Sequence, residues 1–210
     1  MISFATKTVE RMVIAFPFLT RFLRMYYTNI VANEIALGKI RCDDRVLCIG
    51  GGPLPFTALE IADKTGAEVE IIDNDMYAVE AAKKLIKRLN MSDKINVVYG
   101  DGREIDTSKF SVVHVALQAK PHDSILKNVW KKSGDGTRIL LRRPHDNLEM
   151  LYSELSEECA CLACNYAGQG HCTVKETLLF TKGQQGREMH EKTAPCPGRA
   201  AVSSSSFLVG

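Results

Sequence analysis

The sequence predicts an α/β protein with a mostly parallel, doubly wound, Rossmann-like sheet. From residue 44 onward, short apolar runs typical of buried strands alternate with longer amphipathic segments, and this alternation favours a parallel sheet. Glycine or aspartate follows three of these runs, at the sheet edge where open α/β proteins bind ligands. The 210 residues are 45% hydrophobic, which suits one such domain with an appendage.

The first segment, residues 1–42, is predicted to be helical and to cover the site. Val9, Met12, Val13 and Phe16 have helical spacing. Pro17 follows them, and proline breaks or kinks a helix that it interrupts. We therefore expect two or three short N-terminal helices before the first strand.

A domain over residues 43–183 is predicted to hold seven strands, the last of them antiparallel. The expected strands are 46–49, 69–72, 96–99, 112–117, 138–141, 161–166 and 177–181. The expected helices between them are 54–64, 76–89, 124–132 and 148–157. Residues 184–210 are polar and irregular, with four consecutive serines, and are predicted to be a flexible tail.

Charge and hydropathy exclude several classes of partner. The chain has 27 basic and 25 acidic residues, so it lacks the basic excess typical of nucleic-acid binding. It has no apolar run of about 18 residues and no clean signal peptide, so we expect a cytoplasmic protein without membrane contact. Apolar residues in the N-terminal helices would allow a homodimer.

Three strand ends predict a nucleoside site. The first predicted strand runs into Gly50-Gly51-Gly52-Pro53, where glycine lets the backbone take positive φ values and approach a ligand closely. Asp73 ends the second strand, where a carboxylate can accept both ribose hydroxyls. Gly100-Asp101-Gly102 ends the third, where a carboxylate or a backbone group can meet an adenine amino group.

The same turn favours S-adenosylmethionine (SAM) over NAD. The NAD fingerprint needs a third glycine for close helix packing around a pyrophosphate. Here Pro55 occupies that position and Pro53 removes an N–H group from the turn. SAM has no phosphate and needs only room for its methionine part. The expected SAM contacts are Gly50, Gly51, Gly52, Pro53, Asp73, Asn74, Asp101, Gly102 and Leu117.

Several motifs resemble those of the nicotianamine synthase-like proteins. The turn at 49–57 is similar to that family's Gly-x-Gly-Pro-Leu-Pro-x-Thr motif. The segments 26–29 and 141–145 resemble its Tyr-Tyr-x-Asn and Leu-Arg-x-x-His motifs, and 151–152 its Leu-Tyr pair. The resemblance covers about residues 20–155 and implies a methyltransferase-like fold.

The resemblance also implies a reaction. Enzymes of this family move the 3-amino-3-carboxypropyl group of SAM onto an amine, releasing methylthioadenosine. It implies that Tyr26 or Tyr27 covers the site and positions the amine, although both could equally be core aromatic residues. Its longer members carry an acidic catalytic group, for which Glu10 and Glu34 are the local candidates. Methyl transfer to a small molecule is the alternative reaction.

Two further features have alternative interpretations. His145, which follows the fifth strand, could be a base near neutral pH or could simply cap the next helix. Cysteine and histidine residues near the C-terminus have partial zinc-site spacing, which would suit a non-catalytic metal-binding protein. Because a second C-x-x-C pair is missing, we expect no metal there. These residues are Cys159, Cys161, Cys164, His171 and Cys172.

Overall fold

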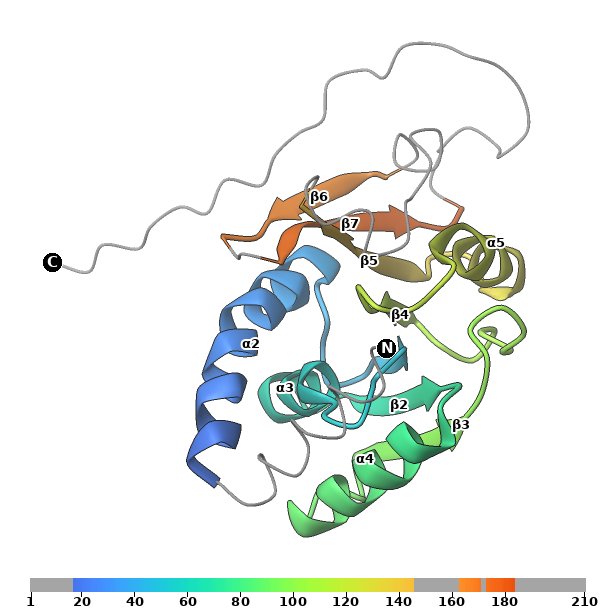
Figure 1. Ribbon diagram of the computed structural model, residues 1–210. Helices are drawn as coiled ribbons and strands as arrows, with labels where there is room; N and C mark the ends of the chain where they lie inside the picture. Colours follow the sequence, from blue (N-terminus) through green and yellow to red (C-terminus); the bar gives the residue numbers. More distant parts are fainter. Residues whose placement is uncertain (1–16, 146–162, 171–172, 184–210) are drawn as a thin grey trace, which may run out of the picture.

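The computed structural model describes residues 17–145, 163–170 and 173–183, and it confirms the Rossmann-like α/β fold (Figure 1). The sheet has seven strands in the order β3-β2-β1-β4-β5-β7-β6. β7 runs antiparallel to both β5 and β6. The strands are β1 (Arg45–Ile49), β2 (Glu68–Asp73), β3 (Ile95–Tyr99), β4 (Val112–Val115), β5 (Arg138–Pro144), β6 (Asn165–Gly168) and β7 (Val174–Thr181).

The N-terminal helix differs from the prediction. Residues 17–38 form one helix of 22 residues, α2 (Pro17–Gly38), which is longer than the short helices that were expected. Pro17 is its first residue, a position where the missing N–H group costs no helical hydrogen bond. Residues 1–16, the predicted helix at 148–157 and the tail at 184–210 lie outside the described residues.

Helices cover both faces of the sheet. The bounds of the other helices are α3 (Phe56–Thr65), α4 (Met76–Arg88) and α5 (His122–Lys132). Buried residues of α2, α3 and α4 pack in one apolar cluster with Val46 and Ile71, whereas those of α5 pack in a second cluster with Leu47 and Val113. Adjacent residues of β1 thus enter opposite clusters, as the alternation of side chains along a strand requires.

The strand register brings the predicted strand ends together. Ile49, the last residue of β1, pairs in parallel with Ile72 of β2 and with Val115 of β4. Asp73 pairs with Tyr99 at the end of β3. The strand order reverses direction between β1 and β4, and open α/β sheets form a ligand-binding crevice at such a switch point.

Candidate functional site

The glycine turn after β1 is fixed against the end of β2. The N–H groups of Gly50 and Gly51 both donate to the carbonyl of Ile72, at 2.9 and 3.3 Å. Gly50 and Gly52 have φ values of 77° and 63°, which glycine adopts far more readily than other residues. A Cβ atom on Gly51 would lie 2.2 Å from Cγ2 of Ile71. The turn therefore requires glycine for both conformation and packing.

Asp73 ties this turn to the start of α4. Its Oδ2 accepts a hydrogen bond from the N–H group of Gly52 at 2.8 Å, and its Oδ1 accepts one from Asp75 at 2.9 Å. Asp75 in turn caps α4 by accepting from the N–H group of Tyr77. A carboxylate can accept about four hydrogen bonds, so the half-buried Asp73 retains capacity for ligand hydroxyls.

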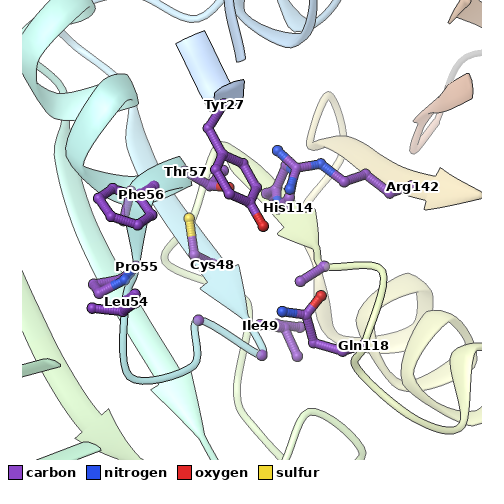
Figure 2. A pocket seen from close by; sticks show the side chains of 14 residues that line it. Tyr27, Cys48, Ile49, Leu54, Pro55, Phe56, Thr57, His114, Gln118 and Arg142 are labelled. Carbon is purple, nitrogen blue, oxygen red and sulfur yellow. The ribbon is translucent and has the colours of Figure 1, made fainter. Parts of the chain in front are cut away.

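A pocket opens beside the turn, between α2, α3 and the sheet (Figure 2). Its walls come from α2, the glycine turn, the start of α3, the end of β1, β4 with the segment that follows it, and β5. The lining residues are Tyr27, Cys48, Ile49, Gly50, Gly51, Leu54, Pro55, Phe56, Thr57, Ala58, His114, Ala116, Gln118 and Arg142. Arg142 is the only charged cation among them, and none of them is acidic.

Tyr27 projects from α2 into this pocket, as Figure 2 shows. Its ring stacks on Phe56 at a centroid distance of 5.8 Å, and the guanidinium carbon of Arg142 lies 5.8 Å from the same ring. The tyrosine is half-buried. The side chain of Tyr26 lies outside the described part of the chain.

A buried ion pair joins α2 to the sheet next to the pocket. Glu34 is fully enclosed and accepts two hydrogen bonds from Arg142, from Nε and from Nη2, each at 2.7 Å. The hydroxyl of Thr177 on β7 donates a third hydrogen bond to Glu34 at 2.9 Å. Burial raises the pKa of Glu34, but the positive charge and hydrogen bonds of Arg142, together with the interaction with His114, outweigh it and hold that pKa well below the ordinary value. Glu34 is therefore an ionised structural partner and does not line the pocket.

Two titratable groups in the pocket wall itself, His114 and Cys48, are held neutral. Burial lowers the pKa of His114 below its ordinary value, although its Nε2 lies 3.2 Å from Oε2 of Glu34. Burial also raises the pKa of the Cys48 thiol to about 12. His114 and Arg142 stand on adjacent strands, and the sequence predicted a pocket role for neither.

The other expected SAM contacts are dispersed around the strand ends. Asp101 forms an ion pair with Arg103 at 2.6 Å, so an adenine amino group would compete with that guanidinium. A Cβ on Gly102 would lie 2.6 Å from Cγ2 of Ile49, which gives this glycine a packing role. Pro53 is half-buried and Asn74 is exposed. Leu117 is buried in a small apolar cluster with Ile30 and Val174.

His145 is half-buried after the end of β5 and is not among the residues that line the pocket. Of the predicted cysteine cluster, only Cys164 is described, and it is an exposed free thiol. Glu10 also lies outside the described residues. Within the described ranges, no three His, Cys, Asp or Glu residues gather as a metal site would require. In the same part of the chain, no helix has the length and apolar character to cross a membrane.

Several solved structures have a fold similar to that of this chain. The chain is 28% identical to MtNAS in two crystal structures, a point mutant in complex with S-adenosylmethionine and a complex with MTA and tNA. The TM-scores are 0.66 and 0.67, covering 74% and 75% of this chain and 62% and 60% of MtNAS. An RNA methyltransferase from Salinibacter ruber is 18% identical to this chain, with a TM-score of 0.57. That match covers 78% of this chain and 97% of the methyltransferase, and it shows the fold alone.

Comparison of sequences points to the same group. The chain is 31% identical over 72 residues to L-histidine 2-aminobutanoyltransferase of Yersinia pestis, a match covering 34% of this chain and 27% of the relative. It thus spans less than two thirds of that relative and of MtNAS. The family model described as "Nicotianamine synthase protein" matches residues 4–165. This chain belongs to the nicotianamine synthase family.

Proposed function

We propose that the protein binds SAM across the ends of β1, β2 and β3 and transfers its 3-amino-3-carboxypropyl group to an amine. The observation that carries the proposal is the pocket in which the glycine turn faces Tyr27, in a chain whose family includes SAM-binding MtNAS. The related aminobutanoyltransferase from Yersinia pestis is named for the same kind of transfer. Under this proposal, α2 covers the site and residues 43–183 form the cofactor domain.

The residues at the strand ends fit SAM. A Cβ built on Gly52 meets no atom within 4 Å, so space is open beside the turn. Asp73 is held in place by two backbone N–H groups and can accept from ribose hydroxyls. Gly50 and Gly51 form part of the pocket wall, which leaves room for the methionine part. Pro53, Asn74, Asp101, Gly102 and Leu117 remain predicted contacts.

The chemistry needs a neutral amine held beside an electrophilic carbon. Bound SAM supplies that carbon next to its sulfonium, and attack there releases methylthioadenosine. The tyrosine hydroxyl of Tyr27 would accept a hydrogen bond from the amine and orient its lone pair. The aromatic wall of Tyr27 and Phe56 would exclude water from the reacting atoms. Tyr26 and His145 stay predicted contributors to the catalytic step.

The acceptor and the cellular setting remain predictions from the sequence. They are a small-molecule amine acceptor, a cytoplasmic location, a homodimer and the absence of a nucleic-acid partner. The alternative, methyl transfer to a small molecule, uses the same cofactor and differs in the product left behind. The spent cofactor therefore separates the two reactions.

The test is to incubate the full chain with SAM and L-histidine as a probe amine and to separate the nucleosides by chromatography. Methylthioadenosine supports the proposed transfer, whereas S-adenosylhomocysteine indicates methyl transfer. Asp73→Asn should weaken SAM binding in calorimetry, and Asp93→Asn, at an exposed surface position, should not. A wild-type protein that binds no SAM contradicts the proposal.

A further inference from the structure

The guanidinium of Arg142 is only partly used by the protein. Nε and Nη2 both donate to Glu34, which leaves Nη1 as the third nitrogen. Nη1 has no hydrogen-bond partner among the described residues, and it is not one of the fully enclosed atoms. Arg142 lines the pocket, so this third nitrogen is the part of the guanidinium that is left to bind a ligand there. Figure 2 shows the guanidinium reaching from β5 toward Tyr27 at the pocket wall.

The orientation of this guanidinium is fixed from two sides. The bidentate contact with Glu34 holds its plane, because two parallel N–H···O bonds define both position and direction. The ring of Tyr27 lies against the same group, 5.8 Å from its central carbon. The unused nitrogen is thus preorganised, and a ligand would lose little entropy in ordering it.

The residues that line the pocket favour a negatively charged group as the hydrogen-bond acceptor for this nitrogen. Among the described residues that line the pocket, none is acidic and Arg142 is the only cation. Hydrogen bonds from arginine to a carboxylate are charge-assisted and stronger than those between neutral groups. The amino-acid end of SAM carries an α-carboxylate, and so does any amino acid that acts as the amine acceptor.

We propose that Arg142 binds the α-carboxylate of an amino-acid moiety in this pocket through Nη1 and thereby selects amino-acid ligands over their decarboxylated analogues. The inference rests on the proposed function and adds a specificity-determining residue to it. Glu34 acts as the positioning residue, since it holds the guanidinium without contacting the ligand. The carboxylate belongs either to SAM or to the acceptor, and the experiment distinguishes them.

The experiment compares two pairs of ligands that differ only in the carboxylate, with methylthioadenosine as the reference that lacks the amino-acid moiety. Calorimetry measures the Kd of SAM, decarboxylated SAM and methylthioadenosine, and then of L-histidine and histamine in the presence of methylthioadenosine. The variant is Arg142→Lys, because lysine keeps the charge beside Glu34 but lacks the planar fork. The matched control is Arg138→Lys, on the same strand, whose guanidinium bonds Asp44 and the carbonyls of Gly38 and Lys39 outside the pocket.

We expect wild-type protein to prefer the carboxylated ligand of one pair by about 10- to 100-fold, the usual range for a hydrogen bond to a charged group. In Arg142→Lys that preference should disappear, while methylthioadenosine binds unchanged. Loss of the SAM preference assigns the carboxylate to SAM, and loss of the L-histidine preference assigns it to the acceptor. The Arg138→Lys variant should keep both preferences.

Two results would overturn the inference. One is a wild-type protein that binds methylthioadenosine but shows neither preference, and the other is an Arg142→Lys variant that keeps both. If the lysine variant fails to fold, the double variant Glu34→Leu/Arg142→Met leaves no unpaired charge and takes the same measurements. A wild-type protein that binds neither SAM nor methylthioadenosine refutes the proposed function itself, and this inference with it.

Discussion

Replacing Glu34 by glutamine tests whether the buried ion pair fastens α2 to the sheet. The carboxylate accepts three hydrogen bonds, two from Arg142 at 2.7 Å and one from Thr177 at 2.9 Å, and it is fully enclosed. In Glu34→Gln, an amide NH₂ group replaces one acceptor and faces a donor, and the guanidinium loses its counter-charge. Breaking a buried pair from one side costs about 3–5 kcal/mol.

That loss is large against a typical unfolding free energy of about 5–15 kcal/mol. It corresponds to a fall in Tm of about 6–20 °C for a domain of this size. Urea titration followed by circular dichroism at pH 7.5 measures the free energy, and thermal melts measure the Tm. The control is Glu68→Gln, since the Glu68 side chain is 65% exposed and its pair with Arg45 should contribute less than about 1 kcal/mol.

The double variant Glu34→Leu/Arg142→Met measures how strongly the two side chains are coupled. Because no charge is left unpaired, it should lose at least about 2 kcal/mol less than the sum of Glu34→Leu and Arg142→Met alone. The reasoning would be refuted by a Glu34→Gln protein as stable as Glu68→Gln. Additive losses in the double variant would also show that the two side chains are not coupled.

Three further predictions concern the pocket wall and the turn. Because the folded state holds the pKa of His114 below its ordinary value, the unfolded chain takes up the proton first. Stability should therefore fall as pH drops from about 7 to 5, and His114→Gln should flatten that slope in melts across this range. Iodoacetamide at pH 9 should label the exposed Cys42 and leave Cys48, whose pKa is about 12, unmodified, as peptide mass spectrometry would show. Gly51→Ala should abolish SAM binding in calorimetry by displacing the turn from β2. At Gly52 the added methyl group faces open space, so Gly52→Ala should weaken SAM binding by only about 1–2 kcal/mol, through conformational strain. Equal losses of SAM binding in the two variants would contradict this.

The strand ends could be predicted from the sequence because their signals are local. Gly50 and Asp73 each follow an apolar run that is buried in the structure, and parallel strands necessarily bring such ends to one edge. Tyr27 lies in the segment 1–42 that was predicted to be helical, but the length of α2 was not predicted. Pro17 was predicted to break or kink the helical pattern, and α2 begins at this residue, a position that proline tolerates.

The buried ion pair beside the pocket and the histidine in its wall could not be predicted in the same way. Glu34 and Arg142 are 108 residues apart, and no spacing rule links a helix residue to a strand that far along the chain. Arg142 lies in the segment that resembles the Leu-Arg-x-x-His motif, but the partner of its guanidinium is set by how α2 packs on β5. His114 lies within an apolar strand, where alternation alone does not show which side chain reaches a cavity. Asp101 was predicted correctly at a strand end, but its contact with Arg103 depends on side-chain geometry.

Tyr27 and Glu34 lie seven residues apart on α2, about two helical turns, so they share one side of the helix. Tyr27 projects into the pocket, and Glu34 accepts hydrogen bonds from the guanidinium of Arg142 in the pocket wall. A rotation or slide of α2 would therefore disturb aromatic cover and arginine together. Transplanting this helix between relatives, or redesigning it, will succeed only if both positions are carried over as a unit.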